Sequence, residues 1–285
     1  MIRGYLGSLE VGDKLPVRIV GVVNLSSASF YKGSIAHSEL EIKNKILQMI
    51  NEGADCIDIG AQSTRPIQIY GGKGRIDKET ELEMVKSTLS ISDSILESYK
   101  NIELSVDTQR EVVAEFALKK GVRIINDISG FKKEPNIAKK IADYDASAVL
   151  MATRKEPGDV FSIDDILLEL SRSIEIGQKC GIKENRLIVD PGIGCWEARD
   201  YKHDYNIIKK LNEFKKLDKP IYVGISRKTS IGKALNDAPP EKRLFGTIGA
   251  TIIALVQGAH IVRTHDVKPT LDAIRVAEAI MNYQE

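Results

Sequence analysis

Residues 102–129 read IELSVDTQREVVAEFALKKGVRIINDIS, and the pattern in this stretch decides the fold. Two short apolar runs, 102–107 and 124–129, flank a longer amphipathic stretch, and a polar turn follows each run. Two strands that are joined through a helix of this length lie parallel to each other in one sheet. The stretch therefore predicts a strand, a helix and a parallel strand.

The same unit recurs eight times along the chain. Most of its apolar runs are rich in Val and Ile and do not alternate cleanly with polar residues, as expected for parallel strands buried on both faces. Eight strand–helix units predict a closed (β/α)8 TIM barrel rather than an open doubly wound sheet. The predicted strands are 19–25, 56–60, 102–107, 124–129, 147–152, 186–190, 220–225 and 261–265.

We expect one domain, residues 1–285, with an N-terminal extension over 1–18 and the barrel over 19–285. Gly4, Gly7 and Gly12 sit among short apolar pieces of the extension, which fits a hairpin that closes the bottom of the barrel. The first helix has a capping box formed by Ser38 and Glu41. One face of that helix carries the apolar residues Ile42, Ile46, Met49 and Ile50.

Composition excludes several classes of protein. The chain has 285 residues, 41 Lys+Arg, 40 Asp+Glu and a net charge of +1, which argues against a broad nucleic-acid-binding surface. Hydrophobic residues make up 42%, enough for a sizeable core. No apolar run approaches the roughly 20 residues that span a bilayer, and the N-terminus lacks the apolar segment of a signal peptide. The 3 cysteines without a CxxC pair fit free thiols, so we expect a cytoplasmic protein with no membrane partner.

Polar side chains end nearly every predicted strand, and in a barrel these ends converge on one mouth. Asp107, Asn126 and Asp190 supply hydrogen-bond acceptors, which suit the donor edge of an amino-substituted heterocycle. The last two strands supply the cationic or basic side chains of Arg227, Lys228, Arg263 and His265, where barrels often bind phosphate. The sequence therefore predicts a ligand with a donor-rich ring at one end and a phosphate at the other.

Structural alternatives stay open for these groups. Asp190 could cap a turn. Asn126 and Asp127 could form hydrogen bonds with loop backbone, and Asp127 fits this role better. Arg263 and His265 could form a salt-bridged surface turn with Asp266. No His/Cys/Asp cluster has zinc spacing, and neither a GxSxG nor a Walker A sequence occurs.

Several separated blocks occur in an order that resembles dihydropteroate synthase, the folate-pathway barrel that joins a pterin to an arylamine. They are GVVN (21–24), GAD (53–55), STRP (63–66), SVDT (105–108), INDISG (125–130), DPGIG (190–194), SRK (226–228) with IG (231–232), and RTHDV (263–267). Each block alone is weak, whereas the ordered set is specific. The resemblance covers the chain from Gly21 to about Val276.

The resemblance implies that 6-hydroxymethyl-7,8-dihydropterin diphosphate reacts with an arylamine in a homodimeric enzyme, and that Mg²⁺ helps diphosphate to leave. Carried over position by position, it assigns the pterin to Asp107, Asn126, Met151, Asp190, Gly224 and Lys228. It assigns diphosphate to Asn24, Thr64, Arg65, Arg263 and His265, with Asn24 as the metal ligand, and the arylamine to Phe30, Pro66 and Thr229. Lys228, Arg65 and Asp107 are the expected catalytic residues.

The first loop departs from the family's pattern. Two positions that are usually acidic carry Ala28 and Lys32, and the usual Glu before the STRP block is Gln62. A carboxylate near a developing cation stabilises it, and a lysine there reverses this effect. We therefore consider Lys32 an arylamine-binding residue that would suit an arylamine bearing a ribose phosphate, as in methanopterin biosynthesis. Plain 4-aminobenzoate, with a lineage-specific loop, is the equal alternative.

Two other kinds of function stay open. A pterin-dependent methyltransferase has the same barrel and pterin edge but binds no diphosphate, so the predicted anion pocket argues for the synthase. A non-catalytic pterin-binding paralogue is supported by the loss of the loop acids.

Overall fold

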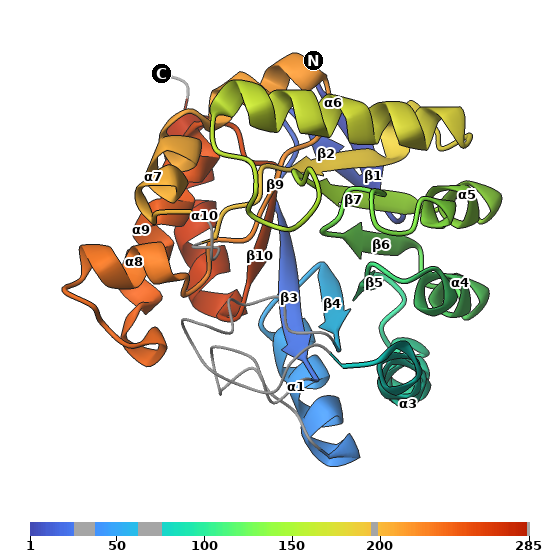
Figure 1. Cartoon of the computed structure of the whole chain (residues 1–285). Coiled ribbons are helices and arrows are strands. Elements are labelled where there is room, and N and C mark those ends of the chain that lie inside the picture. Colours follow the sequence, from blue (N-terminus) through green and yellow to red (C-terminus); the bar gives the residue numbers. More distant parts are fainter. Residues whose placement is uncertain (26–37, 62–75, 195–198, 284–285) are drawn as a thin grey trace.

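The computed structural model describes residues 1–25, 38–61, 76–194 and 199–283. Eight strands form one parallel sheet in the order β8-β7-β6-β5-β4-β3-β10-β9 (Figure 1). A parallel bridge between Val189 and Ile221 joins the two ends of this order, and the Val189 N–H donates to the Pro220 carbonyl at 3.0 Å. The predicted TIM barrel is confirmed. Its strands are β3 (Arg18–Asn24), β4 (Cys56–Gly60), β5 (Glu103–Asp107), β6 (Ile124–Asp127), β7 (Ser147–Met151), β8 (Leu187–Asp190), β9 (Tyr222–Val223) and β10 (Ile261–Thr264).

The predicted strand bounds differ from the observed ones mainly in the last third of the barrel. The expected start at 186 is one residue early, because residues Glu184–Arg186 form a 3₁₀ turn, η2, before β8. The run 220–225 contributes only the two residues of β9 to the regular ladder. Pro220 has no N–H to donate to a neighbouring strand, which shortens the regular pairing at this point.

Helices cover the outside of the barrel (Figure 1). The first, α1, begins with the predicted capping box: the Glu41 N–H donates to the Ser38 hydroxyl at 3.2 Å and the Ser38 N–H to the Glu41 carboxylate at 3.1 Å. Its four predicted apolar residues are buried. The described helices are α1 (Glu39–Asn51), α3 (Lys78–Leu96), α4 (Glu111–Lys119), α5 (Asn136–Asp143), α6 (Ile163–Lys179), α7 (Lys202–Lys209), α8 (Thr229–Ala234), α9 (Leu244–Val256) and α10 (Val267–Met281), with the 3₁₀ helices η3 (Leu211–Leu217) and η4 (Pro240–Lys242).

The N-terminal extension forms an antiparallel hairpin of β1 (Arg3–Leu6) and β2 (Leu9–Gly12). Leu6 and Val11 are buried in one cluster with residues that seven barrel strands point inward. The Gly7 N–H donates to the Ser147 hydroxyl at 3.1 Å, at the start of β7. The hairpin therefore fills the N-terminal end of the barrel, which leaves the C-terminal end as the open mouth.

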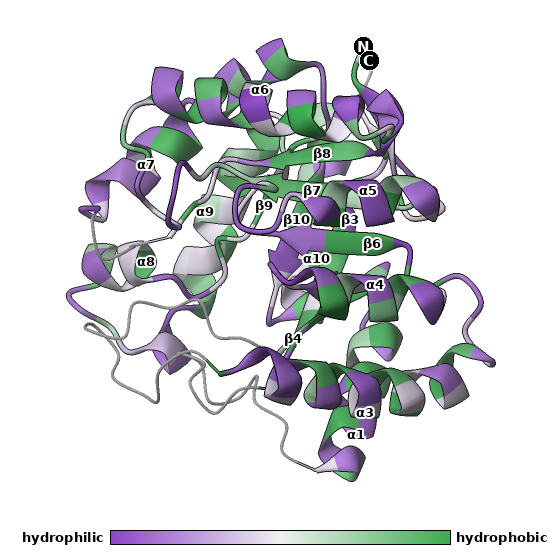
Figure 2. Ribbon diagram, turned by 45° about the vertical axis from the view of Figure 1, so that its right-hand side comes forward, coloured by the Kyte–Doolittle hydropathy of each residue, from purple (hydrophilic) through white to green (hydrophobic). Residues whose placement is uncertain are grey.

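Alternation along the strands places a polar layer above this apolar one. The inward-facing apolar cluster includes Cys56, Ile124, Ile188 and Ile261, one each from β4, β6, β8 and β10. Side chains in a strand point to the same face every second residue. The next inward positions are therefore Asp58, Asn126, Asp190 and Arg263. The β6 ribbon in Figure 2 shows the change, since it passes from hydrophobic to hydrophilic along its length.

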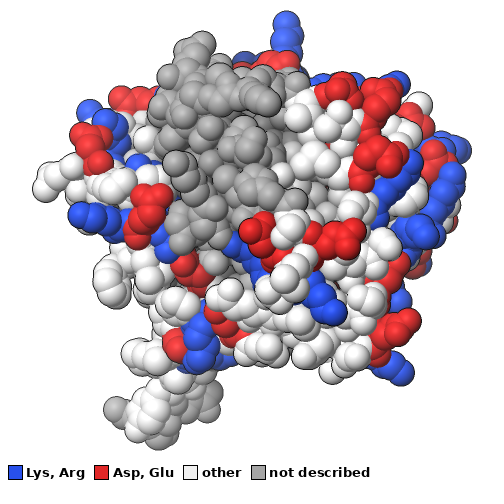
Figure 3. All heavy atoms as spheres, turned by 90° about the horizontal axis from the view of Figure 1, so that it is seen from below, with Lys and Arg blue, Asp and Glu red and all other residues white. Residues whose placement is uncertain are grey.

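Within the described parts of the chain, no helix is both long and apolar enough to cross a membrane. Lys and Arg side chains lie interspersed with Asp and Glu on the face seen from below (Figure 3).

Candidate active site

Ten of the predicted site residues are described, and each lies in the last two residues of a barrel strand, in the loop after one, or at the start of a helix at the mouth. They are Asn24, Asp107, Asn126, Met151, Asp190, Gly224, Lys228, Thr229, Arg263 and His265. The predicted residues Phe30, Lys32, Thr64, Arg65 and Pro66 lie outside the described residues, as do Ala28 and Gln62.

Two acceptors lie side by side where β5 and β6 end. Asp107 pairs in register with Asn126, and the Thr108 N–H donates to the Asn126 carbonyl at 3.0 Å. The Asn126 side chain is buried, and its Oδ1 has no hydrogen-bond partner among the described residues. Burial and the nearby charge of Asp58 raise the pKa of Asp107 to about 7, although Arg263 acts in the opposite direction. Asn126 Oδ1 can therefore accept from a ligand's N–H donor, and Asp107 has a second carboxylate oxygen besides the one near Arg263.

Asp190 ends β8 and takes part in the turn that follows it. Its Oδ1 accepts a hydrogen bond from the Gly192 N–H at 2.8 Å, so the turn-capping alternative is correct for one oxygen. Burial raises the pKa of Asp190 to about 6, while the Gly192 N–H and the charge of Lys228 lower it. The carboxylate can therefore cap its turn and also accept from a ligand, since it has two oxygens.

A buried ion pair fastens the turn after Asp190. Arg199 Nη2 donates to the Gly192 carbonyl at 2.7 Å and lies 3.3 Å from Asp204 Oδ1. The same carboxylate oxygen accepts from the Gly194 N–H at 2.9 Å. Sequence reasoning missed both Arg199 and Asp204, because neither lies at the end of a strand.

Small and apolar groups form part of the mouth. Met151 ends β7 and packs against Ile128 in a small cluster apart from the main core. Gly192 has φ +77°, and a Cβ there would stand 3.2 Å from Met151 Cγ. A Cβ at Gly224 would meet nothing within 4 Å, so the strand beside it borders open space. These residues leave an apolar surface and open space at the mouth, while the pterin contacts of Met151 and Gly224 stay predictions.

Arg263 is held inside the barrel and does not pair with Asp266. Its Nε donates to Asp58 Oδ2 at 2.7 Å, and its Nη2 lies 3.4 Å from Asp107 Oδ2. Asp58 is fully buried in the middle of β4 and also accepts from Asn126 Nδ2 at 3.3 Å. Sequence reasoning missed Asp58. The available signal was a charged residue in the middle of an otherwise apolar strand, which must find a partner.

Positive charge gathers around His265. Burial lowers the pKa of His265 well below its ordinary value, and the charges of Arg263, Lys228, Arg227 and Lys45 add to the effect. The ring Nδ1 lies 2.9 Å from the Ser226 hydroxyl. A neutral imidazole among cations is the environment expected of an anion pocket before its anion binds.

Two lysines contribute to this pocket from different elements. Lys228 precedes α8. Its pKa is lowered on balance, because burial and the charge of Arg263 outweigh the opposite effect of the three acids Asp204, Asp190 and Asp107. Lys45 lies on α1, and its pKa is lowered by burial. Sequence reasoning missed Lys45, although a lysine beside the apolar face of a helix was a visible signal.

The structure corrects the predicted role of Arg227. Its side chain binds Asp266 through two bonds, Nε to Oδ2 at 2.8 Å and Nη2 to Oδ1 at 2.7 Å, and Nη1 donates to the Pro240 carbonyl at 2.7 Å. Arg227 is buried, with φ +56°. This guanidinium therefore links the turn after β9 to η4 and α10, and its charge also acts on His265.

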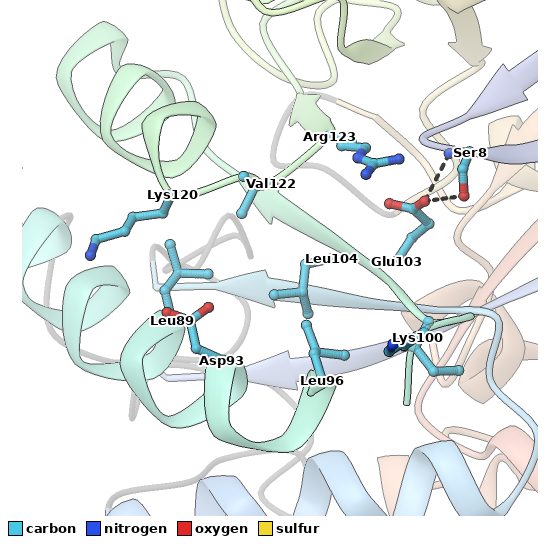
Figure 4. A pocket seen from close by; sticks show the side chains of 12 residues that line it. Ser8, Leu89, Asp93, Leu96, Lys100, Glu103, Leu104, Lys120, Val122 and Arg123 are labelled. Atoms are coloured by element: carbon cyan, nitrogen blue, oxygen red, sulfur yellow. Dashed lines mark hydrogen bonds between the residues drawn. The ribbon is translucent and has the colours of Figure 1, made fainter. Parts of the chain in front are cut away.

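A cavity lined by described residues lies at the other end of the barrel. It measures about 170 Å³ and is lined by Ser8 of the hairpin, Leu104 of β5, Leu89 of α3 and Arg123 before β6, among others (Figure 4). Glu103, at its edge, accepts from the Ser8 N–H at 2.8 Å. The cavity belongs to the closed N-terminal end, whereas the predicted site residues meet at the mouth.

The fold and this mouth together define a barrel enzyme whose site combines acceptors for a donor-rich ring with a pocket for an anion. Residues 20–265 match the family model described as pterin binding enzyme. The chain is 35% identical over 278 residues to dihydropteroate synthase of Clostridium beijerinckii, covering 97% of this chain and 98% of that protein. It is 34% identical over 274 residues to dihydropteroate synthase of Escherichia coli, covering 94% and 93%.

A solved dihydropteroate synthase of Coxiella burnetii, in complex with pteroic acid, superposes on this structure with a TM-score of 0.85 at 29% identity, covering 99% of each chain. The chain belongs to the dihydropteroate synthase family of pterin-binding enzymes.

Proposed function

We propose that this protein is a transferase that condenses 6-hydroxymethyl-7,8-dihydropterin diphosphate with an arylamine and releases diphosphate. The observation that carries this conclusion is the meeting of two kinds of group at one barrel mouth. The acceptors are Asp107, Asn126 and Asp190, and the cations are those around His265, of which Arg263 also reaches Asp107. The family assignment favours this synthase reaction over the methyltransferase and the non-catalytic paralogue.

The pterin ring is oriented by its hydrogen-bond edge. Ring and amino N–H groups donate to Asp107, Asn126 and Asp190, which are fixed on three different strands. Lys228 feels the charges of Asp190 and Asp107, and in this proposal it would donate to the carbonyl side of the ring. Orientation by a rigid scaffold of strands lowers the entropic part of the barrier.

The reaction breaks the bond between the pterin methylene carbon and the diphosphate oxygen, and the electron pair leaves with diphosphate. The arylamine nitrogen then forms the new C–N bond and loses a proton. Arg263, Lys228 and His265 offset the negative charge that develops on the leaving group. The catalytic role of Lys228 is to hold the ring while its charge favours departure of the anion.

Mg²⁺ is the cofactor that we propose for the diphosphate. Among the described residues, no group of three or more His, Cys, Asp or Glu side chains could hold a metal. Mg²⁺ is commonly bound by few protein oxygens together with substrate phosphates, so a single ligand fits. Asn24 Oδ1 lies 3.8 Å from the point where a Cβ on Gly60 would stand, and the absent side chain leaves room beside this oxygen. Mg²⁺ bound there would neutralise charge on the leaving diphosphate.

The identity of the arylamine is the second part of the proposal. Thr229 is the described residue assigned to it, as the first residue of α8 next to Lys228. Lys32 would suit an arylamine that carries a phosphate, because a lysine stands where the family has an acid, and we weigh this substrate equally with plain 4-aminobenzoate.

Release of diphosphate tests both parts. The dihydropterin diphosphate and Mg²⁺ are incubated with 4-aminobenzoate in one reaction and with its ribofuranosyl phosphate counterpart in another. Release that depends on an amine supports the synthase, and the preferred amine names the substrate. Retention of the phosphorylated amine's advantage in Lys32→Asp would contradict the assignment of Lys32. No stimulation by either amine would contradict the synthase itself.

We also propose that the protein acts as a homodimer in the cytoplasm. Phe245, Ile253 and Val256 expose large apolar side chains on α9, and Val276 and Ile280 do so on α10, which packs against α9. Exposed apolar patches of this kind mark sites of association. The free thiols of Cys56 and Cys180 fit a reducing compartment.

A further inference from the structure

Asp58 is a fully buried charged group next to the site, and neither the sequence motifs nor the proposed mechanism uses it. It lies in the middle of β4. Its Oδ2 accepts from Arg263 Nε at 2.7 Å and from Asn126 Nδ2 at 3.3 Å. Its Oδ1 has no hydrogen-bond partner among the described residues. A buried carboxylate is costly unless its partners are held firmly, so these contacts fix the geometry of the groups around it.

The contact with Asn126 decides which way that amide faces. An ionised carboxylate can only accept hydrogen bonds, so the amide must turn its Nδ2 toward Asp58. Its Oδ1 then points away from Asp58, and this oxygen is buried without a partner among the described residues. A buried acceptor left without a donor is a place that a ligand's N–H can fill.

The contact with Arg263 fixes a second group. The guanidinium is planar, and its Nε and Nη2 are occupied by Asp58 and Asp107 at 2.7 and 3.4 Å. Two contacts on different strands set the plane of the guanidinium. Asp58 therefore orients both a predicted pterin ligand, Asn126, and a predicted diphosphate ligand, Arg263.

We propose that Asp58 is a positioning residue that makes the site selective for a ring edge with an N–H donor facing Asn126. This inference rests on the proposed pterin-binding function and names what sets its specificity. If the residue at position 58 could also donate, the Asn126 amide could turn over and accept a ring with a carbonyl at that edge. With Asp58 in place, the carbonyl oxygen of that ring would face Asn126 Oδ1. Two acceptors would then meet without a hydrogen bond between them, which disfavours binding.

The test compares two ring ligands in binding to the whole protein. One is 6-hydroxymethylpterin, and the other is its 2-oxo counterpart, in which a carbonyl replaces the 2-amino donor. We expect the wild-type protein to prefer the pterin and the variant Asp58→Asn to narrow this preference at least tenfold. Asp58→Glu keeps an acceptor-only group and is expected to retain the preference with weaker binding of both ligands. Glu103→Gln is the matched control, a buried acid on the neighbouring strand at the closed end, and should leave the ratio unchanged.

The outcomes separate this inference from the proposed function. A wild-type preference that persists in Asp58→Asn overturns the role of Asp58 and leaves the synthase proposal standing. Failure of the wild-type protein to bind either ring contradicts the proposed function instead. If the position 58 variants do not fold, a crystal structure of the wild-type protein with the pterin decides the question. A ring N–H facing Asn126 supports the inference, and a ring carbonyl or lone pair there contradicts it.

Discussion

At the scale of single residues, the mouth is defined by charges whose state depends on burial. Asp107 and Asp190 are carboxyls with raised pKa values, and His265 is an imidazole with a lowered one. In each case burial is the largest cause, and it favours the uncharged form. A ligand that forms hydrogen bonds or ion pairs with the charged forms of these groups therefore changes their protonation when it binds.

The acidic residues predict a pH dependence of pterin binding. A donor edge needs ionised carboxylates, whereas the free protein takes up protons on Asp107 and Asp190 as pH falls through about 7 and about 6. Protonation therefore competes with the ligand, and affinity should fall by up to about tenfold per pH unit for each protonated group. Calorimetric titration of 6-hydroxymethylpterin from pH 5 to pH 8 measures this. In Asp190→Asn the slope should be reduced, and a flat profile in the wild-type protein would contradict the assignment.

The anion pocket predicts the opposite sign of proton exchange. The lowered pKa of His265 keeps the ring neutral in the free protein, and a bound diphosphate offsets the nearby cations and raises that pKa. Binding of diphosphate should therefore be accompanied by uptake of a proton on His265. Calorimetry in two buffers of different ionisation enthalpy measures the uptake, which His265→Asn should abolish. The same uptake in both proteins would show that His265 is not in the pocket.

At the scale of elements, strand ends carry the site and loop contacts hold those ends. The sequence predicted the strands well, because buried parallel strands are continuous apolar runs. It also predicted Asp107, Asn126 and Asp190 at the mouth, because strand ends converge in a barrel. It did not predict the partner of Arg227, since the bond to Asp266 spans 39 residues and depends on how β9, η4 and α10 pack.

The ion pair of Arg227 and Asp266 should be a major contribution to stability. Both side chains are mostly buried, and removing one partner leaves an unpaired charge. We expect Arg227→Gln to lower the free energy of unfolding by about 3 kcal/mol. Denaturant unfolding measures the change. Lys268→Gln breaks an exposed pair with Asp272 and serves as the control, with a loss of at most about 1 kcal/mol. Equal losses in the two variants would contradict the structural role of Arg227.

At the scale of the whole molecule, the barrel has one closed end and one open end. The hairpin of β1 and β2 fills the closed end, which leaves the mouth as the place where eight strand ends meet. The sequence indicated both features, through the glycines of the extension and the repeat of strand–helix units. It gave no sign of Asp58 as the partner of Arg263, because that contact forms only when β4 and β10 enclose the same interior.

The outer surface predicts association of two chains. Phe245 and Ile280 expose 84% and 72% of their surface on the adjacent helices α9 and α10. If these faces join in a dimer, Phe245→Asp should weaken association at least tenfold, because a charge is then buried without a partner. Sedimentation equilibrium measures the change. Leu168→Asp, on the exposed face of α6, is the control and should leave association unchanged. A monomeric wild-type protein would contradict the proposal.

The most direct test of the central claim is to identify the product by mass spectrometry. The wild-type protein is incubated with the dihydropterin diphosphate, Mg²⁺ and an isotopically labelled arylamine, next to a matched reaction with Asp190→Asn. The account predicts a condensed product that contains the label, with diphosphate released in equal amount and much less of both in the variant. Diphosphate release without incorporation of the label, or equal products from both proteins, would contradict it.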